Sequence, residues 1–302
     1  GELIDFPRMI DVELTNSCNF RCLMCPTGNR SLDRHAEFMT EETYEKIVDQ
    51  CAEHGTALRF IGWGEPTLHP RVMGFVGAAF SRGLLTHLNT NGSKITGNMS
   101  RGLVGMGLDS IKFSFQGVNQ QSYLDMRRTD FFGGMIEAIG LMRWARSKGG
   151  TPWIAASTSI TDETPEQVEK FRQIMTPLVD ELTIGNTTFD FMDLNAVRLR
   201  LGEKAMLEKA MAAESVEKRH PDPCPETFDK LSIHADGTGV VCCNDFSSVT
   251  NLGNVNDTTI AEMWRHPEME AYRERLARKE YSGPLCESCY DYMSCTKKEV
   301  AA

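Results

Sequence analysis

Six apolar, strand-like segments alternate with helical patterns through the first 190 residues. The segments lie at 9–14, 57–63, 84–90, 110–117, 152–160 and 181–187. Each of the first five is followed by a stretch whose apolar residues recur at helical spacing. This alternation is typical of strand–helix units that build a parallel sheet. We therefore predict an α/β fold, a partial (β/α)6 TIM-like barrel with functional sites at the C-terminal ends of its strands.

The pattern changes twice beyond residue 190. Residues 191–219 are charged, favour helix and show no strand pattern, which predicts a helical connector. Residues 230–245 predict a hairpin around an Asp-Gly turn, and residues 258–280 predict one helix. We thus expect a barrel at 1–190, the connector at 191–219, and a small hairpin-plus-helix domain at 220–302.

Charge and hydropathy argue against several classes of partner. The 302-residue chain carries 32 basic and 42 acidic residues, a net charge of −10 that disfavours binding to phosphate backbones or anionic membrane surfaces. No stretch approaches the roughly 20 apolar residues that a membrane span needs. We expect a cytoplasmic protein with no nucleic-acid partner and no membrane partner.

Nine of the ten cysteines fall into two groups, at residues 18–25 and 224–295. Because the cytosol keeps thiols reduced, such grouping indicates metal ligands rather than disulfides. Cys18, Cys22 and Cys25 follow the first predicted strand without a fourth Cys or a His close by. Structural zinc needs four such ligands. Three thiolates instead suit an iron–sulfur cluster with one iron free of protein ligands, and a zinc knuckle or three buried thiols are the alternatives.

The stretch CNFRCLMC resembles the CxxxCxxC signature of the radical S-adenosylmethionine superfamily. The resemblance implies a [4Fe–4S] cluster on these three cysteines, whose open iron binds S-adenosylmethionine. It also implies reductive cleavage of that cofactor to a 5′-deoxyadenosyl radical, which abstracts a hydrogen atom from the substrate. A flavodoxin- or ferredoxin-type protein would then be the reductant.

Four later motifs resemble the positions at which this superfamily binds S-adenosylmethionine. GWGEP is similar to the GGEP turn, with Trp63 at the second glycine, while NTNG is similar to a loop near the cofactor but also suits a plain turn. FSFQG places two side chains on one face of a strand, and YLDMRR holds an arginine for the methionine carboxylate, with Arg128 as the rival. The implied cofactor-binding residues are Gly64, Glu65, Thr90, Asn91, Ser114, Gln116 and Arg127.

The C-terminal cysteines supply the complete set that the first motif lacks. Cys224, Cys242, Cys286 and Cys289 make up a four-thiolate site that suits structural zinc or a [4Fe–4S] cluster. Beside the upstream motif, the arrangement resembles the SPASM/twitch extension of the superfamily. That resemblance implies an auxiliary [4Fe–4S] cluster, and the cysteine count favours one such cluster, so that the protein would hold two clusters in total.

Two C-terminal thiols remain beyond that set. Three roles are open for Cys243 and Cys295: an inert thiol, a substitute cluster ligand or a catalytic hydrogen-atom donor. We expect Cys243 to point to the opposite face of its strand from Cys242. Cys51, on the apolar side of a predicted helix, is interpreted as a small buried residue.

A closed auxiliary cluster would serve as an electron acceptor, since none of its irons is left for substrate. The leading hypothesis is a radical oxidoreductase that abstracts a hydrogen atom from a carbohydrate-like or other small natural-product substrate and dehydrogenates an alcohol to a ketone. The alternatives are a radical epimerase with a cysteine donor, a peptide-modifying maturase, and a zinc-stabilised binding module without enzymatic activity.

Overall fold

The structure is a computed structural model that describes residues 4–146, 150–189, 192–213, 216–217, 224, 226–287, 289 and 296–297. An eight-stranded sheet has the order β6-β5-β4-β3-β2-β1-β8-β9. Its strands are β1 (Met9–Val12), β2 (Ala57–Phe60), β3 (Thr86–Thr90), β4 (Ser110–Ser114), β5 (Trp153–Ile160), β6 (Glu181–Asn186), β8 (Lys230–Ile233) and β9 (Gly239–Val240). The first six are parallel to their neighbours, which confirms the predicted partial α/β barrel. A separate pair joins β7 (Val216–Glu217) to β10 (Thr296–Lys297).

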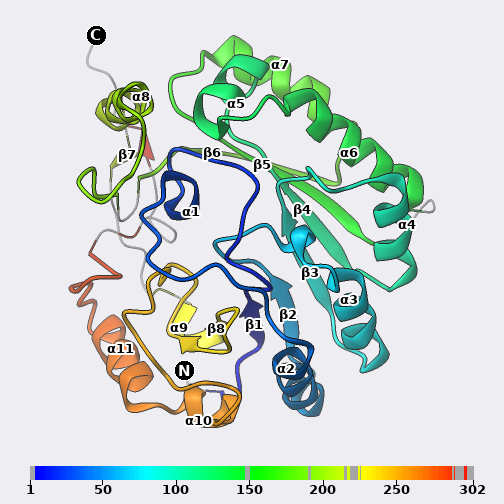
Figure 1. Cartoon of the computed structure of the whole chain (residues 1–302), viewed down its shortest axis with the longest axis vertical. Coiled ribbons are helices and arrows are strands. Elements are labelled where there is room, and N and C mark those ends of the chain that lie inside the picture. Colours follow the sequence, from blue (N-terminus) through cyan, green and yellow to red (C-terminus); the bar gives the residue numbers. More distant parts are fainter. Residues whose placement is uncertain are drawn as a thin grey trace.

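Helices cover the outer side of the curved sheet (Figure 1). These are α2 (Glu41–His54), α3 (Val72–Ser81), α4 (Gly97–Gly105), α6 (Phe132–Ala145) and α7 (Pro165–Met175). The remaining helices are α1 (Pro26–Asn29), the 3-10 turn η1 (Pro66–Leu68), α5 (Gln120–Arg127), α8 (Leu201–Ala212), α9 (Glu226–Asp229), α10 (Ile260–Trp264) and α11 (Pro267–Ala277). Within the described ranges, none of these helices has the length and apolarity that crossing a bilayer requires.

The two faces of the sheet differ in chemistry because side chains alternate along a strand. The face toward the helices is buried and apolar, and its residues are Ile10, Val12, Leu58, Phe60, Leu88, Ile111, Phe113, Ile154 and Ala156. The alternate positions carry polar groups on most strands: Asp11, Arg59, His87, Asn89, Ser110, Lys112, Ser114, Ser157, Ser159 and Thr183. The barrel therefore has an apolar outer layer and a polar inner face.

The predicted hairpin joins the barrel sheet directly. Strand β8 pairs in parallel with β1, from Met9 opposite Lys230 to Val12 opposite Ile233, and β9 returns antiparallel to β8. Trp264 of α10 is fully buried, and its indole Nε1 donates a 2.9 Å hydrogen bond to the Ile4 carbonyl. The C-terminal part thus shares both sheet and core with the first strand.

Several boundaries differ from the sequence predictions. The single helix expected over 258–280 is two helices, because Pro267 begins α11 and the His266 side chain caps it by accepting the Glu268 N–H. Strand β9 ends at Val240, so Cys242 and Cys243 lie in the following turn rather than on the return strand. The expectation that they occupy opposite faces of a strand is therefore wrong. Helix α5 has no counterpart among the predicted elements.

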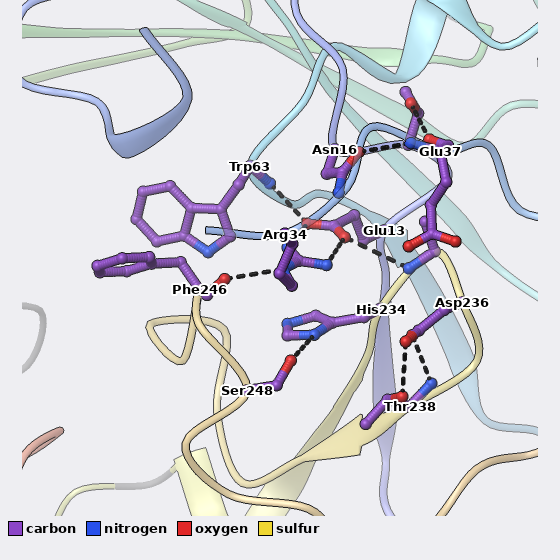
Figure 2. A network of polar contacts seen from close by, with 12 residues as sticks. Glu13, Asn16, Arg34, Glu37, Trp63, His234, Asp236, Thr238, Phe246 and Ser248 are labelled. Atoms are coloured by element: carbon purple, nitrogen blue, oxygen red, sulfur yellow. Dashed lines mark hydrogen bonds and ion pairs between the residues drawn. The ribbon is translucent and has the colours of Figure 1, made fainter. Parts of the chain in front are cut away.

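A buried carboxylate joins the barrel to the C-terminal part (Figure 2). Glu13, just beyond β1, accepts two hydrogen bonds from the Arg34 guanidinium, at 2.7 and 2.9 Å. It also accepts the backbone N–H groups of Trp63, at 3.0 Å, and Ala235, at 3.3 Å. Although burial alone would raise the pKa of Glu13, the Arg34 hydrogen bonds and the nearby charges of His234 and Arg34 hold it below its ordinary value.

We predict that Glu13→Gln lowers the free energy of unfolding by about 3–5 kcal/mol at pH 7, because one partner of a buried ion pair is removed. Since the folded-state pKa of Glu13 is depressed, its contribution is present above the unfolded pKa near 4.5 and is lost as pH falls through the folded value. Urea unfolding from pH 7 to pH 3, at matched metal content, measures both effects.

The control is Glu42→Gln, whose carboxylate is 80% exposed and pairs with Lys46 across one helical turn. That change should cost at most about 0.5 kcal/mol. Equal losses in the two variants would contradict the role assigned to Glu13.

Candidate functional site

The first cysteine group lies in the loop that leaves β1 and enters α1. The Cys25 N–H donates to the Cys22 carbonyl at 3.3 Å, and the Cys25 carbonyl accepts the Asn29 N–H at 2.8 Å. The Asn29 side chain also donates to the Leu23 carbonyl at 3.0 Å, and the Leu23 N–H donates to Met126 at the end of α5. These bonds fix the backbone, so the three sulfurs converge without bonding to one another.

All three cysteines line one pocket, which we call the N-terminal cysteine pocket. Its other lining residues are Met24, Ile61, Gly62, Trp63, Gly64, Glu65, Pro66, Asn89, Thr90, Asn91, Ser114 and Arg127. Six of the seven cofactor-binding residues named from the sequence are therefore in its wall. They come from the ends of β2, β3 and β4 and from α5, the C-terminal edge of the sheet at which α/β barrels place their sites.

Ser114 and Gln116, predicted to share one face of a strand, differ in their surroundings. Ser114 ends β4 and faces the pocket, whereas Gln116 is buried and donates to the Thr187 hydroxyl at 2.5 Å. Gln116 does not belong to the pocket wall formed by the described residues. Its suggested contact with the cofactor stays a prediction.

Glu65 connects two of the loops that form this wall. Its buried carboxylate accepts the backbone N–H of Asn91 at 2.6 Å and the hydroxyl of Thr90 at 2.7 Å. It also accepts the N–H of Thr67 in its own turn at 3.0 Å. Burial raises the pKa of Glu65, and these donors oppose that rise. The carboxylate therefore holds the GWGEP and NTNG loops together.

Glycine at position 64 is required by a close approach of two backbones. An added Cβ would lie 2.2 Å from the Thr15 carbonyl and 2.6 Å from that of Ser17, far inside contact distance. The next residue confirms this packing, since the Glu65 N–H donates to the Ser17 carbonyl at 2.8 Å. The GWGEP loop is thus seated directly on the segment that leads into the cysteines.

Arg127, the last residue of α5, brings a positive charge to the three sulfurs. Its guanidinium lies 3.5 Å from the Cys22 sulfur and donates to the carbonyls of Ser114 and Phe115, at 2.5 and 3.1 Å. Its buried Nε has no hydrogen-bond partner among the described residues. The rival Arg128 points elsewhere, toward Glu203 at 3.4 Å. A guanidinium with an unused donor in the pocket wall suits an anionic ligand such as a carboxylate.

The chemistry of the three sulfurs also fits a metal cluster. Burial raises the pKa of Cys18 to about 12, and the neighbouring Cys22 adds to the rise. Burial and the Cys22 charge likewise raise the pKa of Cys25. Such thiols stay protonated at pH 7 until a metal replaces their protons. Cys18, Cys22 and Cys25 would hold a [4Fe–4S] cluster, and the facing wall would hold S-adenosylmethionine.

The second cysteine group forms a separate, mostly apolar pocket, the C-terminal cysteine pocket. Cys224, Cys242, Cys243, Cys286 and Cys289 line it together with Glu226, Asn244, Tyr272, Leu276, Tyr281 and Leu285. The pKa of Cys242 is raised well above its ordinary value by burial and by the charges of Cys243, Glu226 and Cys289. The Asn244 side chain lies 3.4 Å from the Cys289 sulfur. Five thiols in one pocket fit a closed four-thiolate cluster with one thiol to spare.

Cys243 is the thiol of this pocket that lies outside the predicted set of four ligands. The Cys243 sulfur lies 4.0 Å from a carboxylate oxygen of Glu226. The other candidate hydrogen donor, Cys295, lies outside the described residues. Cys51 is fully buried in the core on α2, away from the described walls of both cysteine pockets.

Two family models match the chain. Residues 12–176 match the radical SAM superfamily, and residues 224–290 match an iron–sulfur cluster-binding domain known as SPASM. The chain belongs to the radical S-adenosylmethionine superfamily. It is a radical SAM protein with a SPASM domain, and these two domains imply S-adenosylmethionine, its [4Fe–4S] cluster and auxiliary iron–sulfur binding.

Three relatives span nearly the whole chain. A tungsten-containing aldehyde ferredoxin oxidoreductase cofactor-modifying protein of Pyrococcus furiosus is 24% identical over 92% of this chain and 86% of its own. A PqqA peptide cyclase of Rhizobium meliloti is 23% identical over 94% of this chain and 79% of its own. The crystal structure of BtrN with AdoMet and 2-DOIA aligns with a TM-score of 0.58 at 16% identity, covering 96% of this chain and 93% of BtrN. The structural likeness shows a shared fold.

Some residues that shape the site carry no motif of their own. Glu13 and Arg34 were not singled out from the sequence, although the acidic residues at alternate positions of MIDVEL are a signal that this strand has a polar inner face. Asn244 and Tyr272 enter the C-terminal pocket only through the fold, from a turn and from α11. No spacing in the sequence marks them.

We predict that Cys242→Ser removes the C-terminal cluster while Cys243→Ser retains it. The reconstituted chain should hold about eight irons, Cys242→Ser about four, and Cys243→Ser about eight. Iron and acid-labile sulfide counts check this pair of adjacent substitutions. If only the Cys243 variant loses iron, Cys243 is the ligand and the assignment is wrong.

We also predict that Arg127→Lys weakens S-adenosylmethionine binding about tenfold or more, because an ammonium cannot replace the forked guanidinium. Equilibrium dialysis on iron-loaded protein measures the dissociation constant. Arg128→Lys is the matched control and should bind as the unmodified chain does. Equal weakening by both changes would show that Arg127 has no specific part in holding the cofactor.

Proposed function

We propose that the protein is a radical oxidoreductase that dehydrogenates an alcohol carbon of a small polar substrate. The observation that carries the proposal is the pair of cysteine pockets: one offers three thiols beside a wall of cofactor-binding groups, and the other offers a full set of four. The first suits radical generation and the second suits electron acceptance. Dehydrogenation needs both.

The stoichiometry of the reaction explains why two sites are needed. Converting a secondary alcohol to a ketone removes two electrons and two protons. Abstraction of the carbon-bound hydrogen atom takes one electron with one proton, the hydroxyl proton leaves to solvent, and the second electron requires an acceptor. A [4Fe–4S] cluster held by Cys18, Cys22 and Cys25, with S-adenosylmethionine bound, would supply the abstracting carbon radical after one-electron reduction. We propose a flavodoxin- or ferredoxin-type protein as the electron donor.

The inner face of the barrel supports a polar substrate. This face carries Asn89 on β3 and both Lys112 and Ser114 on the neighbouring β4. Asn89 and Ser114 also line the N-terminal cysteine pocket. Ser157 continues the same face, since it lies opposite Ser114 in the sheet. Hydroxyl, amide and ammonium groups bind hydroxyls and amines of a carbohydrate-like molecule.

Epimerisation receives less support. It would require a thiol to return a hydrogen atom to the substrate radical, and the described candidate, Cys243, lines the C-terminal pocket rather than the pocket of Cys18, Cys22 and Cys25. Zinc stabilisation without catalysis is supported less still, because a binding module has no use for the three-thiol pocket and its cofactor wall.

Peptide modification is the second candidate function. A PqqA peptide cyclase aligns with 94% of this chain at 23% identity. SuiB bound to the precursor peptide SuiA has the same fold, with a TM-score of 0.66. A polar inner face suits a peptide backbone as well as a polyol. The two candidates differ in the product and not in the radical step.

The test uses reconstituted protein under anaerobic conditions with a chemical reductant and candidate aminocyclitols, sugars and peptides, each deuterated at the reacting carbon. We expect the deuterium to appear in 5′-deoxyadenosine and the product to lack that deuterium and one hydroxyl hydrogen. One molecule of product should form for each S-adenosylmethionine consumed. Product that keeps the substrate's oxidation state, with the abstracted deuterium replaced by a solvent hydrogen, would establish epimerisation. A crosslinked or otherwise altered peptide, with sugars and cyclitols untouched, would establish the second candidate.

A further inference from the structure

Among the described residues, Trp63 belongs to the wall of the N-terminal cysteine pocket and also contacts the turn of the C-terminal one. It stands at the centre of the GWGEP loop and lines the pocket of Cys18, Cys22 and Cys25. Its indole Nε1 donates a 3.0 Å hydrogen bond to the carbonyl of Cys243. Its ring packs edge-on against Phe246, with centroids 5.3 Å apart.

The turn from Cys242 to Phe246 is held partly by itself and partly by the barrel. Internally, the Asp245 N–H donates to the Cys242 carbonyl at 3.1 Å and the Phe246 N–H donates to the Asn244 carbonyl at 2.9 Å. Two further carbonyls of this stretch accept donors from the barrel. Trp63 donates to Cys243, and Arg34 Nε donates to Phe246 at 2.8 Å.

Both barrel donors are fixed by the same carboxylate (Figure 2). Glu13 accepts the Arg34 guanidinium and the backbone N–H of Trp63. The Trp63 carbonyl in turn accepts the hydroxyl of Thr27, two residues after Cys25. Trp63 is thus held through its backbone at the first cysteine loop and reaches with its side chain to the second.

We propose that Trp63 is a positioning residue that fixes the Cys242–Phe246 turn against the N-terminal cysteine pocket and tunes the potential of the C-terminal cluster. Its indole N–H presents the positive end of a dipole to the peptide group between Cys243 and Asn244. Such a dipole near thiolate ligands stabilises the more negatively charged, reduced state of a cluster.

Trp63→Phe is the direct test, because it keeps an aromatic ring but removes the N–H donor. Redox titration of the reconstituted full chain, followed by electron paramagnetic resonance, reports each cluster separately. We expect the midpoint potential of the C-terminal cluster to fall by about 59 mV, which corresponds to a tenfold change in the one-electron equilibrium constant. The potential of the N-terminal cluster should stay unchanged, and chelator removal of C-terminal iron should be about fivefold faster.

Two further variants separate this role from general loosening. Phe246→Leu leaves the indole hydrogen bond and should affect chelator release more than the potential. Trp153→Phe alters an exposed tryptophan on β5 and should change neither. An unchanged C-terminal potential in Trp63→Phe, or equal shifts of both clusters, would overturn the proposal. Neither measurement depends on the substrate, so failure of the dehydrogenase assignment would leave these readouts intact.

Discussion

The buried ion pair of Glu13 and Arg34 is the contact on which the arrangement of the two cysteine sites depends. The Glu13 carboxylate follows β1 and accepts donors from the segment after the first cysteine loop, from the GWGEP loop and from the C-terminal hairpin. A carboxylate removed from water at this point is stable because a guanidinium and two N–H groups surround it. These loops therefore share one fixed reference point, beside the strand from which the three-cysteine loop emerges.

The two cysteine pockets are both buried but differ in the residues that surround their sulfurs. In both, low solvent access raises the thiol pKa values, so a metal must replace the protons before the sulfurs become thiolates. The N-terminal pocket places Arg127 and the ends of three strands opposite its sulfurs, which leaves room for a charged ligand. The C-terminal pocket surrounds its sulfurs with Leu276, Leu285 and tyrosine rings, which suits a cluster that exchanges electrons rather than ligands.

Much of this organisation could be predicted from residue patterns, and the remainder depends on long-range contacts. The strand–helix alternation predicted the six parallel strands, because period and apolar character are local properties. CNFRCLMC and GWGEP predicted two walls of one pocket, since loops after parallel strands meet at one edge. Pairing of β8 with β1 joins residues more than 200 positions apart, and nothing in either strand specifies that partner. Helix α5 escaped prediction because its sequence, QQSYLDMR, has a weak apolar stripe.

The most direct test of the two-site assignment is whether S-adenosylmethionine perturbs one cluster and not the other. Electron paramagnetic resonance of the reduced, reconstituted chain should show two cluster signals, and adding S-adenosylmethionine should change only the signal that disappears when Cys18, Cys22 and Cys25 are replaced by alanine. A C-terminal site that holds zinc in place of iron, or a spectrum in which the cofactor changes both signals or neither, would contradict the division into one open and one closed site.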